Sequence, residues 1–170
     1  MPRPATPKPE PVIDSTDARI LRVLAADPRC SLAGIAEAAG LARNTVHSRV
    51  AKLERDGALQ TFERRINPAA LGYPLTAFIF VMVTQRNLES IATALREIPE
   101  VLEVDGLSGV TDLLVRIAAR DADDLYRIAG QVLDIDGVEK TTTALAMRGL
   151  LQYRIAPLLD RLSESGPGTA

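Results

Sequence analysis

The stretch that decides the fold is residues 20–59, ILRVLAADPRCSLAGIAEAAGLARNTVHSRVAKLERDGAL. Its apolar residues recur at three- and four-residue spacing in three runs, the pattern of amphipathic helices. The runs are separated by Asp27-Pro28 and Gly40 and end at Gly57, residues that stop or cannot continue a helix. The pattern therefore predicts three short helices. We place them at residues 14–26, 32–39 and 43–56.

The starts of these predicted helices differ in their capping residues. Asp14 and Ser31 precede the first two helices, and each side chain can accept a backbone N–H of the following turn. Ala42 precedes the third helix and has no such group, a loss of about 0.5–2 kcal/mol relative to a hydroxyl cap. The third helix therefore starts directly after Ala42 or, alternatively, only at Asn44 or Thr45.

Two short helices, a tight turn and a third helix with a polar outer side describe a helix-turn-helix, whose third helix enters the DNA major groove. At about 100° per residue, an inward stripe of Val46, Val50 and Leu53 turns the polar residues outward. Asparagine and serine can bond base edges, whereas lysine and arginine supply positive charge for phosphate. The candidate DNA contacts on this helix are Arg43, Asn44, Thr45, His47, Ser48, Lys52 and Arg55.

Three further arginines are candidate DNA contacts. Arg49 falls beside the apolar stripe, so it is either a DNA contact or a structural ion-pair partner. Residues 58–65 are predicted to be extended, and Arg64 and Arg65 at their end could press on phosphate as a wing. Because charged helix faces are usually only solvated, a helical subdomain that binds no DNA is the alternative at this point.

From residue 75 onward, apolar runs rich in β-branched residues alternate with amphipathic segments. Pro99 stops the first amphipathic segment, and Asp121 caps the second. The order is strand, helix, strand, strand, helix, strand, which is the ferredoxin-like βαββαβ arrangement, so the whole chain is of the α+β class. The predicted strands are 75–84, 101–107, 113–119 and 138–147, and the predicted helices are 87–98 and 121–134.

The turn GLSGVTD at residues 106–112 carries the candidate small-molecule site. Its glycines let backbone N–H groups approach a carboxylate, its hydroxyls add donors, and Asp112 can accept from an ammonium group. The alternative is a plain hairpin in which Gly109 only serves its backbone angle and Asp112 caps the turn. The candidate effector contacts are Gly106, Ser108, Gly109, Thr111 and Asp112, with Thr141 and Thr143 as further residues.

The composition of this 170-residue chain limits its possible functions. Its one cysteine, Cys30, cannot form an internal disulfide, and its one histidine, His47, leaves no Cys/His cluster for zinc. No apolar run reaches the roughly 20 residues of a membrane span, and the N-terminus lacks the pattern of a secretory signal. We therefore expect a cytoplasmic protein without a membrane partner, a metal site or a cofactor.

The net charge of −2 is unevenly divided along the chain. Residues 14–66 contain nine Lys/Arg and seven Asp/Glu, whereas residues 67–170 contain nine and fourteen. The positive excess of the first part indicates that this part meets a polyanion. Residues 1–13 contain five prolines and are predicted to form a disordered arm, either inert or touching the DNA backbone through Arg3 and Lys8.

Residues 20–59, followed by INPAALGYPL at 66–75, resemble the Lrp/AsnC (feast/famine) transcriptional regulators. Further motifs of this family are Pro99-Glu100-Val101, Ser108-Gly109 with Asp112-Leu113-Leu114, and Gly137-Val138 leading to Thr141 and Thr143. The resemblance covers residues 14–150 and implies a winged helix-turn-helix joined to a βαββαβ amino-acid-binding (RAM) domain. It also implies double-stranded DNA and an amino acid as partners, and a homo-oligomer that is a dimer or assembles further into a tetramer or octamer.

These features divide the chain into five predicted segments. They are a Pro-rich arm at 1–13, a winged helix-turn-helix domain at 14–66, a linker at 67–74, a RAM domain for effector binding and oligomerisation at 75–150, and a C-terminal extension at 151–170. The extension has a helical apolar pattern, and it lies outside the resemblance. That pattern consists of Ile155, Leu158, Leu159 and Leu162.

Two other functions are alternatives to a ligand-responsive regulator. Sirohaem decarboxylases are enzymes that resemble the same two-domain fold, but the second domain here has no histidine and keeps the Ser108–Asp112 turn. A DNA-packing protein without a ligand would bind DNA in a salt-dependent way, indifferent to sequence and to amino acids. Cys30 has no histidine partner for nucleophilic catalysis. We therefore predict no enzymatic activity and no catalytic residues.

Overall fold

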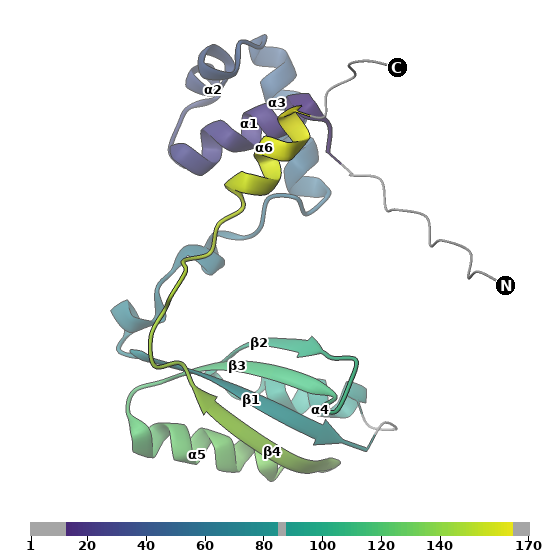
Figure 1. Ribbon diagram of the computed structural model, residues 1–170, viewed down its shortest axis with the longest axis vertical. Coiled ribbons are helices and arrows are strands. Elements are labelled where there is room, and N and C mark those ends of the chain that lie inside the picture. The colour runs from purple at the N-terminus through teal and green to yellow at the C-terminus, as the bar shows by residue number, and fades with distance from the viewer. Residues whose placement is uncertain (1–12, 85–87, 165–170) are drawn as a thin grey trace, which may run out of the picture. The chain divides into compact units, whose positions relative to one another are not determined.

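The computed structural model describes residues 13–84 and 88–164, which form two compact units (Figure 1). The first unit contains residues 13–61 together with residues 152–164, and the second contains residues 62–151. The predicted Pro-rich arm, apart from its last residue, lies outside the described residues. Among the described residues, none of the helices is long and apolar enough to cross a membrane.

The first unit consists of four helices. α1 is Ser15–Ala26, α2 is Leu32–Ala39, α3 is Arg43–Arg55 and α6 is Ala156–Glu164. The predicted caps of the first two helices are confirmed, because Asp14 accepts from the backbone N–H of Asp17 and Ser31 accepts from that of Gly34. Gly40 ends α2 with a φ of +61°, a left-handed conformation that glycine adopts without strain.

The core of the first unit lies where α1, α2 and α3 meet. Ile20 of α1, Ile35 of α2, and Val46 and Leu53 of α3 are buried and form one cluster. The backbone N–H of Leu41, just after the turn, donates to the carbonyl of Ala36 at 2.8 Å and so closes the connection between α2 and α3. The predicted inward stripe of α3 is therefore confirmed, because Val50 also packs against this cluster.

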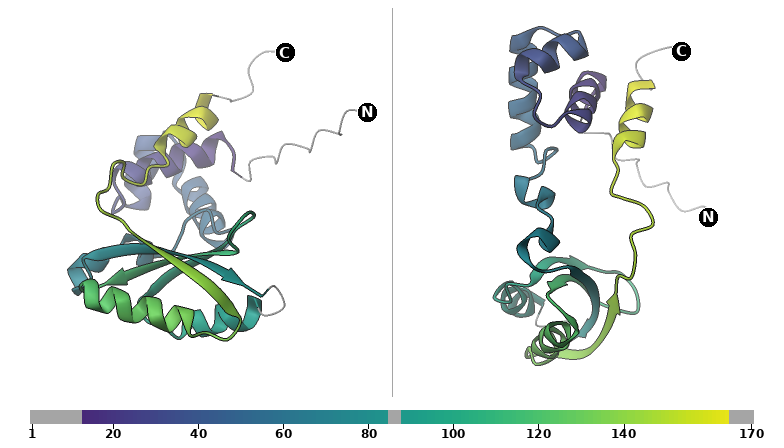
Figure 2. Two further views of the ribbon diagram at one scale, coloured as in Figure 1. Left: turned by 60° about the horizontal axis from the view of Figure 1, so that its bottom comes forward. Right: turned by 90° about the vertical axis from the view of Figure 1, so that its left-hand side faces the viewer.

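The second unit is the predicted βαββαβ arrangement. Its elements are β1 (Leu75–Val83), α4 (Leu88–Arg96), β2 (Val101–Gly106), β3 (Leu113–Ala119), α5 (Ala122–Leu133) and β4 (Val138–Leu145). The strands form one antiparallel sheet in the order β2-β3-β1-β4. Both helices lie on the same face of this sheet (Figure 2).

The two faces of the sheet differ in what covers them. Alternate β1 residues, among them Ile79 and Val81, are fully buried in a core that includes residues of α4 and α5. The residues between them, Phe78 and Phe80, point to the opposite face and are half-buried. Phe80 pairs across the sheet with Leu114 of β3, so this helix-free face carries an apolar patch.

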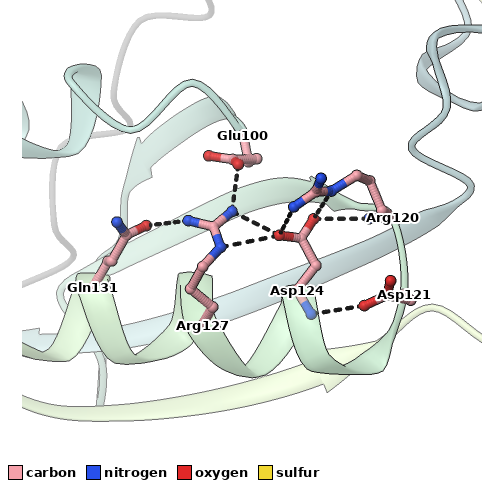
Figure 3. A network of polar contacts seen from close by, with 6 residues as sticks. All are labelled: Glu100, Arg120, Asp121, Asp124, Arg127 and Gln131. Atoms are coloured by element: carbon pink, nitrogen blue, oxygen red, sulfur yellow. Dashed lines mark hydrogen bonds and ion pairs between the residues drawn. The ribbon is translucent and has the colours of Figure 1, made fainter.

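A polar network ties α5 to the start of β2 (Figure 3). Asp124, in the first turn of α5, is buried and accepts hydrogen bonds from Arg120 and Arg127. Arg127 also pairs with Glu100, the residue before β2. These hydrogen bonds to its carboxylate hold the pKa of Asp124 well below its usual range.

The prediction of an extended segment at 58–65 is wrong. The structure has a 3-10 helix at Phe62–Arg65 and a second one at Pro68–Leu71 within the predicted linker. In the described part of the chain, all strands of the sheet come from residues 75–145, so an extended segment at 58–65 would lack a neighbour for its backbone groups. The short helix closes its own bond instead, from the N–H of Ile66 to the carbonyl of Glu63 at 3.0 Å.

Candidate functional site

The outer side of α3 carries most of the polar side chains of this helix. The helix begins at Arg43, directly after Ala42, although Ala42 makes no side-chain cap. Its predicted contact residues lie on the solvent side, where Arg43, Asn44, His47, Ser48 and Arg55 are exposed and Thr45 and Lys52 are half-buried. The basic residues of its last turn, Lys52 and Arg55, also complement the negative end of the helix dipole.

The hydroxyl of Ser48 is already used within the helix. Its Oγ donates to the carbonyl of Thr45 at 3.1 Å. The hydroxyl oxygen keeps its lone pairs as acceptors, so Ser48 can take a hydrogen bond from a base but has no second proton to donate. In its side-chain amide, Asn44 carries both a donor and an acceptor, which makes it the more versatile of the two for reading a base edge.

Arg49 pairs with residues at the start of α1, so the structure shows the predicted ion-pair role. Its Nη1 lies 3.2 Å from Oδ1 of Asp17, which is buried, and it also pairs with Asp14. The pKa of Asp14 is lowered, first by the N–H of Asp17 that donates to it and also by Arg49. Asp14 and Asp17 cap each other reciprocally at the start of α1, so Arg49 fastens α3 to that helix end.

The two wing candidates are placed elsewhere. Arg64 and Arg65 belong to the 3-10 helix of the second unit. Arg64 pairs with Glu103 of β2, and the guanidinium of Arg65 lies 5.5 Å from the ring centroid of Phe62. Because residues 58–65 form no strand, the helix-turn-helix has no β-wing built from them, and the predicted wing contacts are corrected accordingly.

The turn between β2 and β3 is the second candidate site. Gly109 has a φ of +147°, a backbone conformation that L side chains rarely adopt. A Cβ built on Gly106 or Gly109 would meet no atom within 4 Å, so the backbone of the turn is open to an approaching ligand. Ser108 is exposed and Thr111 is half-buried. The turn therefore presents the backbone and hydroxyl groups that the sequence predicts.

Asp112 has a structural task in this turn. Its Oδ2 accepts from the backbone N–H of Val83 at the end of β1, at 2.9 Å. Its own N–H donates to the carbonyl of Val81, and its carbonyl accepts from Leu107. The carboxylate therefore ties the turn to the neighbouring strand β1, which is a structural role other than the turn cap that the sequence left as an alternative, and ligand binding would have to use the carboxylate in addition to it.

The strand threonines lie away from this turn. Thr141 pairs with Val81, which on its other side pairs with Leu113 next to Asp112. Thr141 and Leu113 are therefore two strand spacings apart, about 10 Å. Thr143 lies two residues further along β4, opposite Ile79. Within one chain the structure does not bring these two residues onto the turn.

A groove beside the turn was not predicted. It lies between α4 and β2, has a volume of about 530 Å³ and borders Gly106. Its walls are apolar through Leu88 and Leu102, both of them partly exposed, and charged through Glu89 and Arg96. Two leucines could have indicated this groove from the sequence. Leu88 and Leu102 lie at the ends of a helix and a strand that are otherwise predicted to bury their apolar residues.

A helix-turn-helix in one unit, joined to a βαββαβ unit with an open turn and a groove, is the architecture expected of a DNA-binding regulator with a small-molecule domain. Two family models match the chain: the AsnC-type helix-turn-helix domain over residues 13–54 and the Lrp/AsnC ligand binding domain over residues 76–155. Together with the relatives below, these matches show that the chain belongs to the Lrp/AsnC family of transcriptional regulators.

The similar proteins are regulators. HTH-type transcriptional regulator FL11 of Pyrococcus furiosus is 32% identical over 81% of this chain and 91% of its own length. HTH-type transcriptional regulator AldR of Mycolicibacterium smegmatis is 34% identical over 81% of this chain and 83% of its own length.

Two solved structures that resemble this one are those of E. coli AsnC, with a TM-score of 0.75, and of the NMB0573/L-Met complex from Neisseria meningitidis, with a TM-score of 0.73. Both are 25% identical, covering 86% and 83% of this chain and 100% and 94% of their own. The chain is accordingly a regulator and not an enzyme.

Proposed function

We propose that this regulator changes its DNA binding when an amino acid binds at the turn 106–112. The observation that carries the proposal is the similarity of the second unit to a ligand-binding domain, one solved relative of which is a complex with L-Met. Because the similar proteins are transcriptional regulators, we expect this one in the cytoplasm, where it would meet DNA. The effector would be an amino acid, without any further cofactor.

The contacts to DNA would come from the exposed side of α3. Asn44 and Ser48 in its first half are suited to base edges, whereas Lys52 and Arg55 in its last turn are suited to phosphate. Arg49 would act through α1 and not by touching DNA, because its guanidinium is held by two carboxylates.

The turn and the groove beside it offer partners for both ends of an amino acid. Backbone N–H groups at Gly109, with the hydroxyls of Ser108 and Thr111, would hold the carboxylate. Asp112 would accept from the ammonium group while it keeps its bond to Val83. The apolar wall of the groove would take the amino-acid side chain.

The regulator would act as a homodimer or a larger assembly. A single recognition helix offers few base contacts, and the known helix-turn-helix dimers read two half-sites about one DNA turn apart. The helix-free sheet face, with Phe78, Phe80 and Leu114, is an apolar patch that a second copy would cover. Light scattering at micromolar concentration should give at least twice the 18.3 kDa chain mass, and a monomer would contradict the proposal.

The experiment that tests the effector is a thermal-shift screen of the twenty amino acids. A ligand of the native state raises the apparent stability by RT ln(1 + [L]/Kd), about 2.7 kcal/mol at a hundredfold excess over Kd. We expect at least one amino acid to raise the Tm and to change DNA affinity in a gel-shift assay. DNA binding that is indifferent to every amino acid and to sequence would indicate the DNA-packing alternative instead.

The site is tested with Asp112→Asn. Asparagine keeps a carbonyl oxygen for the N–H of Val83 but loses the negative charge for an ammonium group. The amino-acid effect on DNA affinity should disappear, while basal DNA binding and the circular dichroism spectrum stay unchanged. Asp105→Ala, at an exposed position on β2, is the matched control. A normal response of Asp112→Asn would move the effector site away from this turn.

A further inference from the structure

The last helix of the chain packs against the first. α6 contacts α1 in the first unit, and the two helices lie side by side in Figures 1 and 2. The family models match residues 13–54 and 76–155, so neither of them reaches α6. The matched family domains therefore assign no role to this helix.

The contact between the two helices has an apolar and an ionic part. Leu159 of α6 is 4% exposed, whereas its neighbour Leu158 is 56% exposed, which shows which side of the helix is covered. Next to it, Asp160 lies 3.1 Å from Nη1 of Arg22 on α1. Ala18 lies one turn before Arg22 on the same side of α1 and is fully buried, and its small side chain allows a close approach.

α1 also contacts α3. One of its faces contributes Ile20 to the core shared with α2 and α3. Its first turn holds Arg49 of α3 through Asp14 and Asp17. α6, α1 and α3 thus form a continuous series of contacts within one unit, with α1 in the middle.

The path of the chain also links α6 directly to the second unit. The second unit, residues 62–151, is inserted in the sequence between α3 and α6. Residues 146–155 connect β4 to α6, and ten extended residues span at most about 35 Å. The ligand-binding unit is therefore joined covalently to the DNA-binding unit both before its first strand and after its last.

We propose that α6 is a functional fourth helix of the DNA-binding unit, through which the ligand-binding unit holds α1 and thereby α3 at a second point. Seating of α6 on α1 keeps α3 in its DNA-binding position. Release of α6 loosens the clamp on α3 and lowers DNA affinity, even when no amino acid is present. This role goes beyond the proposed effector response, which concerns the turn 106–112.

The test compares Leu159→Glu with Leu158→Glu in the full chain. Both variants place the same charge on neighbouring positions of α6, but only Leu159 is buried against the unit. We expect Leu159→Glu to speed amide hydrogen exchange in α6 and α1 and to weaken DNA binding about tenfold, within the range usual for coupled elements. Leu158→Glu should match the unmodified chain in both measurements, and exchange in β1 and β3 should be unchanged in both variants.

Three results would overturn the proposal. The first is fast exchange throughout α6 in the unmodified chain, and the second is equal DNA affinity of the two glutamate variants. If Leu159→Glu does not fold, Leu159→Ala is compared with Leu158→Ala, and equal behaviour of that pair is the third. Because no effector is added, these outcomes are distinguishable from a failure of the amino-acid proposal, which would leave the α6 results intact.

Discussion

α1 and α5 begin in the same way but serve different ends. Each has an aspartate at its N-cap, Asp14 or Asp121, that accepts the N–H of a buried aspartate three residues later, Asp17 or Asp124. Each buried aspartate in turn holds arginine. In α1 that arginine comes from α3, whereas in α5 both arginines are close neighbours in sequence. The same arrangement of two aspartates thus fastens α3 to α1 in one unit and closes a local network in the other.

The difference lies in the sequence distance that each arginine bridges. Arg120 and Arg127 lie four and three residues from Asp124, within one helical turn, and only Arg127 reaches further, to Glu100. Arg49 lies thirty-two residues from Asp17. Loss of the Asp124 network should therefore lower the stability of the second unit. Loss of the ion pair between Arg49 and Asp17 should weaken DNA binding. The predictions below test this division.

Acid should have the largest effect and should separate the two units. The folded-state pKa values of Asp14 and Asp124 are both lowered from the ordinary aspartate value of 3.8, Asp124 by more. Their stabilisation is present above that value and is lost as pH falls through the folded pKa. We expect hydrogen exchange in α1 to accelerate at a higher pH than exchange in α5. The reverse order in a titration from pH 5 to about pH 2 would contradict this ranking.

Asp124→Asn should have the next largest effect, on stability alone. The amide keeps the shape of the side chain but leaves Arg120 and Arg127 without their shared negative charge. The melting temperature should fall by about 5–10 °C, a typical result of breaking a buried polar network. Asp123→Asn is the matched control, since Asp123 lies in the same turn but is exposed. An equal effect of both substitutions would show that only the helix dipole matters.

Arg49→Ala should weaken DNA binding without changing its salt dependence. The substitution frees the start of α1 from α3, so we expect affinity to fall about fivefold to tenfold. A residue that touches phosphate would also reduce the slope of log affinity against log salt, by about one. Arg55→Ala serves as the control in which that slope should fall. A reduced slope for Arg49→Ala would restore its role as a DNA contact.

Structural features that depend on neighbouring residues could be predicted from the sequence, whereas contacts between residues far apart in the sequence could not. The helices and strands depend on periodicity and caps within a few residues, and α2 and β3 have the predicted bounds. Three contacts join residues more than thirty positions apart in the sequence: the ion pair of Arg49 with Asp17, the packing of α6 on α1, and the ion pair of Arg64 with Glu103. Ser48 was predicted to face outward and does, but its bond to Thr45 is not visible in a helical pattern.

The predicted strand at 58–65 shows why a local pattern can also mislead. Its residues show no strong helical periodicity, which favours an extended conformation. Three charged residues in a row, Glu63 to Arg65, offer no alternation that would bury one face. With no neighbouring strand in the described sheet, the segment closed into a 3-10 turn instead.

The most selective effects should come from single contacts on α3, and they separate base reading from charge. Asn44→Ala should lose about 1–3 kcal/mol on the specific duplex if the amide makes a bidentate contact to a base, and very little on a random duplex. Lys52→Ala should weaken both duplexes by the same small factor and reduce the salt slope by about one. Competition binding at two salt concentrations measures both quantities at once. If the two variants behave alike on specific and random DNA, α3 does not divide its surface into base-reading and phosphate-binding halves, and the functional role of its first turn has to be abandoned.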